Sequence, residues 1–182
     1  WLWLSTGVRA VDHAVESVCS RTAQPFTDAT CLHGLTMLAR SLRRTKSHPD
    51  DLDARLESQV GVWLAATGLG RVELGASHGI GHELGAVADV PHGYTSCVLL
   101  HNVLRHNHEI NASRQELVSR ALGDPAVQAG DLIESLVRAL GMPLTLRDVG
   151  VRRDQFDAVA RASMENVFVR SNPRPVRSPE DV

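Results

Sequence analysis

Apolar residues recur along most of the chain at intervals of three and four, which is the spacing of one face of an α-helix. Asp28 can cap one such segment, which we expect to run from residue 29 to about residue 46. Pro49-Asp50-Asp51 opens the next segment, and Gly68 ends it. Further helices are expected in a segment that carries His78 and His82, over residues 89–105, over 111–122, over 124–140 with Gly141 at the C′ position, and over 153–169.

Strand signals are almost absent from this pattern. Alternation of period two is scarce and aromatic residues make up 4% of the chain, so the sequence predicts an all-α fold, a helical bundle. We expect one helical domain over residues 1–169, because 182 residues with 43% hydrophobic side chains can bury a sizeable core. Residues 170–182 contain three prolines, and we expect an extended tail that needs a partner surface to become ordered.

Composition excludes several classes of protein. The net charge of −2 lacks the basic excess of a nucleic-acid-binding protein. No apolar run has the length of a membrane span, and no secretory signal segment opens the chain. The cysteines are odd in number and lack C-x-x-C spacing, which favours a reducing, cytoplasmic location over a disulfide framework. They are Cys19, Cys31 and Cys97.

The strongest chemical signal is a group of three histidines, His78, His82 and His92, in a largely apolar setting. His78 and His82 are four residues apart, so their rings project from one face of a helix. Neutral imidazole is a favoured ligand of zinc and ferrous iron, and three protein ligands leave a position open for catalysis. The alternative is that two of them are ordinary helix histidines satisfied by hydrogen bonds, since short motifs give false positives.

Two glycines, Gly79 and Gly81, separate the first two histidines. Glycine is a poor helix former, and helices tolerate it mainly where another segment or a ligand must come close. We therefore expect a close approach to this helix.

These residues belong to a longer pattern with a known counterpart. His78-Gly-Ile-Gly-His82-Glu-Leu-Gly85, followed by Pro91-His92-Gly93 and the apolar run 98–107, resembles the signature of the iron-containing (group III) alcohol dehydrogenases. Ser5–Glu16 resembles the first metal-binding helix of that family, and Gly141–Gly150 and Asn172–Pro175 resemble its closing segments. The resemblance spans nearly the whole chain and implies the helical bundle of the dehydroquinate synthase-like superfamily, with maleylacetate reductases as the nearest branch.

The resemblance also implies that this chain is the second of two domains. Members of the family carry an N-terminal nucleotide-binding domain, and no strand followed by G-x-G-x-x-G and a helix is recognisable here. NAD(P) would be bound mainly by that missing domain, and the isolated fragment would be inactive. The full-length protein would be an oxidoreductase, maleylacetate reductase-like or an alcohol dehydrogenase, that transfers hydride between nicotinamide and a small carbonyl or alcohol substrate. A homodimer is a candidate assembly.

Carried over by motif, the resemblance implies that His13, His78 and His92 are the imidazole ligands of Fe2+ or Zn2+. Typical members add an aspartate four residues before the first histidine, and this position is Arg9 here. Arginine effectively never deprotonates, so its charge would raise the cost of holding a divalent ion. The metal is therefore doubtful in this chain.

Arg9 and Asp12 each have two interpretations. Arg9 either takes the place of the ion, polarising a carbonyl or clamping a carboxylate, or turns outward. Maleylacetate reductases also replace the aspartate, which makes them the nearer comparison.

Asp12 directly precedes His13, and its side chain points about 100° away from that of His13. One interpretation is that Asp12 is a partner of the metal ligands. The other is that it is a carboxylate that faces solvent or pairs with Arg9.

The resemblance places His82 near the nicotinamide and the substrate, where an imidazole with a pKa of about 6.5 can pass a proton to the alkoxide. The alternative role of His82 is packing. The other histidines are assigned to helix surfaces or helix ends, outside the site: His33, His48, His101, His106 and His108. Two rival functions stay open, namely a truncated non-catalytic metal-binding or interaction domain, and a dehydroquinate synthase-like lyase.

Overall fold

The computed structural model describes residues 1–182 and contains eight α-helices, three short 3-10 helices and no strand. The predicted all-α class is therefore confirmed. The α-helices are α1 (Leu2–Cys19), α2 (Pro25–Ser47), α3 (Leu52–Ala65), α4 (Ala76–Ala88), α5 (His92–Leu122), α6 (Ala129–Ala139), α7 (Phe156–Glu165) and α8 (Val167–Arg170). The 3-10 helices are Ala66–Gly68, Arg153–Gln155 and Pro179–Asp181.

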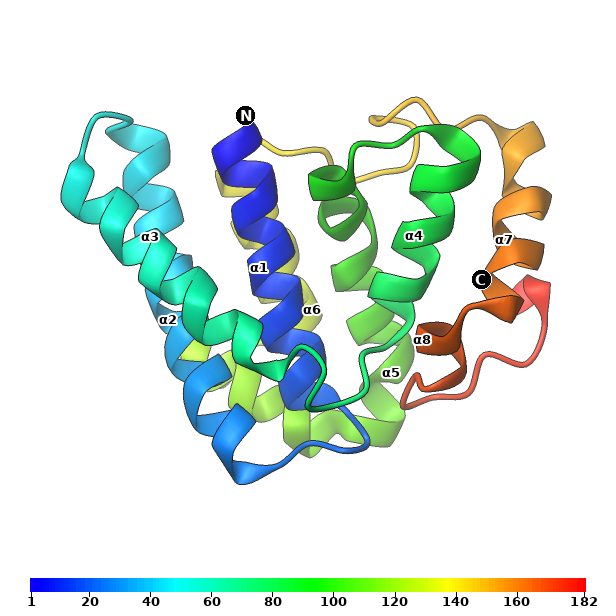
Figure 1. The fold of residues 1–182 in the computed structure, drawn as a ribbon, viewed down its shortest axis with the longest axis horizontal. Helices are drawn as coiled ribbons and strands as arrows, with labels where there is room; N and C mark the ends of the chain where they lie inside the picture. Colours follow the sequence, from blue (N-terminus) through cyan, green and yellow to red (C-terminus); the bar gives the residue numbers. More distant parts are fainter.

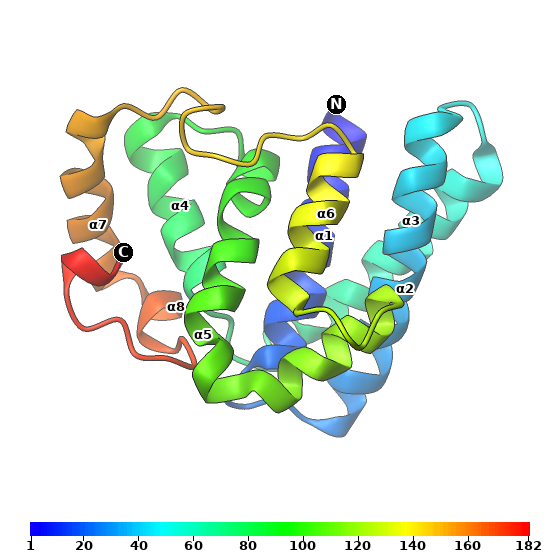
Figure 2. The same cartoon turned by 180° about the vertical axis from the view of Figure 1, so that it is seen from behind.

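The helices form a bundle in which α1 and α5 are central (Figure 1). The pair α2 and α3 packs at one end, and α4, α7 and α8 pack at the other, as the view from behind also shows (Figure 2). Helix α6 lies against α5. None of these helices is both long and apolar enough to cross a membrane.

Two apolar clusters hold the bundle together, and α5 contributes to both. The larger has 22 buried residues, among them Val8 and Val11 of α1 and Leu35 of α2. The smaller has nine and joins Ile80 of α4 to Val169 of α8. Burial of this apolar surface is the main force that holds α1 and α4 on either side of α5.

The helix boundaries follow local capping, and not every predicted cap is correct. Helix α2 begins at Pro25, earlier than predicted, because the side chain of Gln24 accepts a hydrogen bond from the Phe26 amide. Asp28 is therefore a first-turn residue and not the cap. Asp51 caps α3 as expected by accepting from the Ala54 amide. Gly141 follows the C-cap of α6 with φ of +69°, as predicted for C′.

Helix α5 corrects the prediction of two separate helices over residues 89–105 and 111–122. The chain stays helical across the intervening residues and bends at Asn111, whose φ of −129° and ψ of 30° are not helical. Gln115 bridges the bend, because its side-chain amide donates both to the Leu104 carbonyl at 2.7 Å and to the Asn111 side chain at 2.9 Å. The sequence signal at Asn111 was real, but it marks a kink and not a helix start.

The predicted helix over residues 153–169 is interrupted. Asn166 is extended between α7 and α8, and its side chain caps α8 by accepting from the Phe168 amide. The short helix α8 thereby turns back onto α4. Gly79 permits this approach, since a Cβ there would lie 2.5 Å from a methyl carbon of Val169. The close approach expected at the glycines of this helix is therefore confirmed at Gly79.

The tail after α8 packs on its own domain. Asn172 is fully buried, and its side chain donates to Asn107 of α5 and to the Arg174 carbonyl, both at 2.7 Å. Its Oδ1 accepts from the Ala76 amide at 3.1 Å. The surface that orders this predicted tail is thus supplied by α4 and α5 of the same chain.

Candidate functional site

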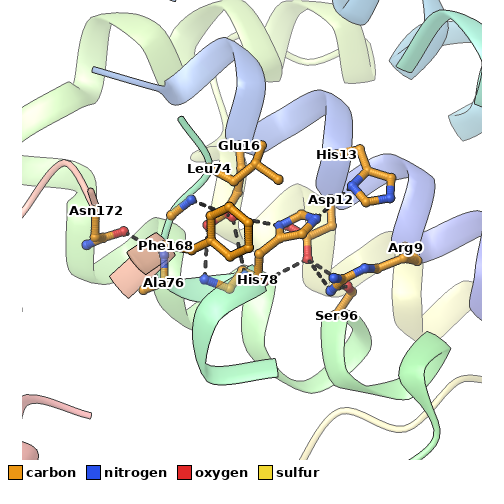
Figure 3. A network of polar contacts seen from close by, with 12 residues as sticks. Arg9, Asp12, His13, Glu16, Leu74, Ala76, His78, Ser96, Phe168 and Asn172 are labelled. Atoms are coloured by element: carbon orange, nitrogen blue, oxygen red, sulfur yellow. Dashed lines mark hydrogen bonds and ion pairs between the residues drawn. The ribbon is translucent and has the colours of Figure 1, made fainter. Parts of the chain in front are cut away.

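The candidate site lies where the middle of α1 meets the N-terminal parts of α4 and α5 (Figure 3). Helix α1 supplies four of its side chains, at intervals of three and four residues, so they share a face of the helix. The chemistry-bearing residues are Arg9, Asp12, His13 and Glu16 from α1, His78 and His82 from α4, and His92 and Ser96 from α5. Three elements that are distant in the sequence therefore build one polar cluster.

Glu16 fixes the start of α4 on α1. Its carboxylate accepts from the backbone amides of Gly75 at 2.9 Å, Ser77 at 3.0 Å and His78 at 3.3 Å, which are free donors at a helix N-terminus. Its Oε2 also lies 2.7 Å from Nδ1 of His78. Burial alone would raise the pKa of Glu16, but the hydrogen bond and charge of His78 and the backbone donors outweigh it, so the pKa lies below its ordinary value.

Sequence reasoning did not assign a role to Glu16. The available signal was its position, one turn after Asp12 on a helix whose other residues in that region are mostly apolar. A carboxylate on a buried helix face needs donors, because burying a charge without partners is costly.

His78 and His13 face each other, with 2.7 Å between Nε2 of His78 and Nδ1 of His13. Because ionised Glu16 is an acceptor, Nδ1 of His78 must donate to it, so in the neutral form of His78 the other nitrogen, Nε2, is an acceptor. In that form Nδ1 of His13 is the donor between the two rings. Burial and the proximity of His78 lower the pKa of His13 to about 4, although Asp12 acts in the opposite direction.

Arg9 points into the cluster and is only 6% exposed. Its Nη1 donates to Oγ of Ser96 at 3.1 Å, and its Nη2 lies 3.5 Å from Nε2 of His82. A Cβ at Gly81 would be tight against Thr95, at 3.0 Å from its hydroxyl oxygen, but only in ordinary contact with Nη1 of Arg9 at 3.6 Å. The inward interpretation of Arg9 is therefore the one that the structure supports.

Asp12 is fully buried and pairs with Arg9, with 3.7 Å between Oδ2 and Nη1. The same oxygen accepts from the hydroxyls of Ser77 at 2.8 Å and Ser96 at 2.6 Å. The solvent-facing alternative for Asp12 is thus wrong and the Arg9-paired alternative is correct, while the 3.6 Å between Oδ1 of Asp12 and Nδ1 of His78 is also compatible with the role of a partner to the predicted ligands. Ser77 and Ser96, which the sequence pattern did not single out, are needed because they satisfy this carboxylate.

His82 and His92 form the more open edge of the cluster. Their rings are stacked, with centroids 5.8 Å apart and planes 18° apart. Phe168 of α8 meets the ring of His82 edge-on at a centroid distance of 5.5 Å. Burial lowers the pKa of both histidines, and the positive charge of Arg9 lowers it further. Phe168 carried no sequence signal, because α8 turns back onto the site only through tertiary packing.

The donor set does not fit a divalent metal ion. His13 and His78 converge, but their facing nitrogens are hydrogen bonded to each other. His13, His78 and His92 are not a set whose ligand atoms all lie within 4.8 Å of one another; the one such set is Asp12, Glu16 and His78.

That second set is already committed to hydrogen bonds. Both oxygens of Glu16 and the Oδ2 atom of Asp12 accept from donors of the protein, and Nδ1 of His78 faces Glu16. Among the ligand atoms of this set, only Oδ1 of Asp12 is buried without a hydrogen-bond partner, and it lies 3.6 Å from Nδ1 of His78. One free oxygen beside a guanidinium is a poor site for iron or zinc, which prefer several nitrogen, oxygen or sulfur ligands.

The remaining histidines lie outside the cluster, as expected. His33 and His48 are exposed. His101 is buried within α5 near the α6 residue Glu134, so its predicted place on a helix surface or at a helix end is wrong. His106 lies beside Arg174 of the tail. The cluster therefore combines four imidazoles, one fixed guanidinium and two ionisable carboxyl groups, an arrangement suited to proton transfer beside a positive charge.

Comparison with known proteins shows the family of the chain. Residues 3–182 match the model of the Fe-containing alcohol dehydrogenase family, C-terminal. The chain is 34% identical over 179 residues to lactaldehyde reductase of Escherichia coli (strain K12), covering 93% of this chain and 46% of that protein. It is 32% identical over 182 residues to 1,3-propanediol dehydrogenase of Klebsiella pneumoniae, covering 95% of this chain and 47% of that protein.

A solved structure shares the fold. Maleylacetate reductase from Agrobacterium tumefaciens superimposes with a TM-score of 0.88 at 28% identity, covering 98% of this chain and 49% of that one. The chain thus spans about half the length of the curated relatives and solved structures that it matches.

Proposed function

Because the chain belongs to the iron-containing alcohol dehydrogenase family, we propose that it forms the helical half of a nicotinamide-dependent oxidoreductase. The substrate would be a small carbonyl compound or the corresponding alcohol. The observation that carries this proposal is the convergence of four imidazoles and the Arg9 guanidinium at one place. The names of its relatives, a lactaldehyde reductase and a 1,3-propanediol dehydrogenase, support the same class of reaction.

The nicotinamide, bound mainly by the other half of the protein, would supply the hydride that reaches the carbonyl carbon. The carbonyl oxygen then gains negative charge and needs one proton for each hydride. His82 is the group that we assign to this transfer, because it lies at the more open edge of the cluster.

The contact with Arg9 indicates which atom of His82 carries the proton. Arginine has no acceptor, so Nε2 of His82 must be unprotonated when Nη2 of Arg9 donates to it. The proton of neutral His82 is then on Nδ1, the atom from which we propose that it passes to the alkoxide. In the oxidation direction the same nitrogen takes the proton back.

Arg9 has an electrostatic role in this proposal. A fixed positive charge beside His82 favours the negative alkoxide over the neutral carbonyl, and it acts strongly because the guanidinium is shielded from water. This role is compatible with a maleylacetate reductase-like branch as well as with an alcohol dehydrogenase.

The decisive experiment uses the full-length protein that the natural gene encodes. Oxidation of NADH and NADPH is followed with a panel of small aldehydes and oxo acids, in the wild type and in His82→Ala. We expect turnover with at least one carbonyl class and a decrease in kcat of about 100-fold or more in the variant, since positioned proton transfer contributes that much. His33→Ala, an exposed histidine of α2, is the matched control and should keep its kcat within about twofold.

Two outcomes would contradict the proposal. Full kcat in His82→Ala would remove the assigned proton donor. Absence of nicotinamide oxidation with every carbonyl tested would favour the rival functions, a non-catalytic domain or a lyase.

A further inference from the structure

We infer that the Arg9 guanidinium is a resident cation of this site, which takes the electrostatic place of a divalent ion and makes the site independent of iron and zinc. The inference goes beyond the proposed reaction, because it concerns what the cluster binds and not what it converts. It rests on the position of one side chain among its neighbours.

The guanidinium is held in place from two sides. Ser96 of α5 accepts from Nη1, and the Asp12 carboxylate of α1 faces the same nitrogen. Ser96 in turn donates to Asp12 at 2.6 Å, so the three side chains form a closed triangle of polar contacts. Nη2 continues toward His82. A side chain fixed in this way cannot swing out without losing its contacts with Ser96 and His82 and removing the positive charge that faces the buried Asp12 carboxylate, which is costly.

The charge of Arg9 also opposes any added cation. Arginine keeps its proton at all relevant pH values, and the site is shielded from water, so repulsion between the guanidinium and a divalent ion is weakly screened. Asp12 is the carboxylate closest to the guanidinium, and its charge already balances that of Arg9. Glu16 is occupied by the N-terminus of α4 and His78.

Position 9 is also a place from which a side chain could act as a ligand. It precedes His13 by four residues on α1, so its side chain lies one turn away on the same face. A carboxylate here would join His13 and His78 as a third ligand, and three protein ligands with water are enough for zinc. The single residue that blocks the ion is thus also the residue that could have held it.

Arg9→Asp tests the inference directly. Purified wild type and variant are freed of metal with chelator and titrated with Zn2+ by calorimetry, and with Fe2+ under anaerobic conditions followed by metal analysis. We expect no stoichiometric binding by the wild type and close to one ion per chain in Arg9→Asp. The affinity should rise by about 100-fold or more, because the change removes a repulsive charge and adds an oxygen ligand.

Two control variants separate the causes. Arg9→Gln removes the charge without adding a ligand and should bind more weakly than Arg9→Asp. Arg21→Asp makes the same change of charge at an exposed position and should bind no better than the wild type. A thermal shift with and without Zn2+ on the wild type gives an answer even if Arg9→Asp does not fold.

Stoichiometric metal in the wild type, or a Zn2+-dependent increase in its melting temperature of several degrees, would overturn the inference. So would equal affinities in the wild type and in a folded Arg9→Asp. Metal content is measured without substrate or cofactor, so failure of the proposed reaction leaves this test intact.

Discussion

At the scale of single residues, Glu16 connects the start of one helix to the ring of the central histidine. Its two oxygens accept hydrogen bonds from three backbone amides at the start of α4, including that of its N-cap Gly75, and from Nδ1 of His78. Because both oxygens face donors, an amide NH2 group in place of either oxygen would face another donor. The position of the His78 ring therefore depends on the Glu16 carboxylate.

Glu16→Gln should therefore lower the free energy of unfolding by about 2–4 kcal/mol, since it replaces charge-assisted hydrogen bonds with at least one pair of facing donors. Urea denaturation followed by circular dichroism measures this. Glu165→Gln is the matched control: the side chain is 83% exposed and pairs with Arg170, and its effect should stay within about 0.5 kcal/mol. Equal stabilities of the two variants would show that Glu16 does not anchor α4.

The sequence identified some residues of the cluster and missed others for a physical reason. The spacing of His78 and His82 predicted a shared helix face. Both rings do contact side chains of α1, since His78 faces His13 and His82 faces Arg9. His92 was expected to share an ion with His13 and His78, but it stacks on His82 instead. Spacing fixes directions within one helix, whereas the distance between His92 and His13 depends on how α5 crosses α1.

At the scale of elements, the packing of α8 on α4 depends on a glycine. A Cβ at Gly79 would lie 2.5 Å from a side-chain carbon of Val169 and 2.9 Å from its backbone nitrogen. The backbone atom cannot move without displacing α8. Phe168, which lies against His78 and His82, would move with it.

Gly79→Ala should lower the free energy of unfolding by about 1–3 kcal/mol, the usual cost of overpacking. Gly85→Ala is a control in the same helix, because the nearest atom to its Cβ would be the Val90 carbonyl oxygen at 3.7 Å. There the higher helix propensity of alanine should raise stability by up to about 1 kcal/mol. Thermal unfolding of both variants measures the difference, and a stabilised Gly79→Ala would show that α8 does not pack closely.

The existence of the helices was predictable from periodicity, while several of their ends were not. Asn111 looks like a cap because asparagine is favoured there, yet Gln115 bridges the bend and α5 continues. Asn166 is a real cap, but it lies in a segment whose apolar spacing continues on both sides of it. Caps compete with tertiary contacts, and the sequence alone does not show which of the two prevails.

At the scale of the whole molecule, the candidate site lies between the two apolar clusters. Helix α1 belongs to the larger one, α4 to the smaller, and α5 to both. Packing of these three helices brings Arg9, Ser96 and His82 together across long sequence separations. Such convergence depends on the full core, so destabilising the bundle should also disturb the site.

The same burial makes the fold sensitive to acid. Five histidines have a pKa lowered chiefly by burial: His13, His82, His92, His101 and His106. In the unfolded chain each returns to about 6.5. Between that value and the lower folded pKa, the unfolded state binds more protons than the folded state, so acidification favours unfolding.

The free energy of unfolding should therefore be fully retained above about pH 6.5 and should fall as the pH is lowered toward 4, the value to which the pKa of His13 drops. We expect a loss on the order of 2 kcal/mol between pH 7.5 and pH 5, after allowing for screening by solvent at the more exposed rings. His101→Leu provides the internal comparison, because His101 is 5% exposed and lies away from the candidate site. Burial lowers its pKa, with a further contribution from Arg105, so removing the ring should make the loss of stability on acidification smaller.

His33→Leu is the control, because it changes an exposed ring and should leave the pH dependence as it is in the wild type. Urea denaturation at several pH values measures all three proteins, and a stability that rises as the pH falls from 7.5 to 5 would contradict the lowered pKa values of these histidines in the folded state.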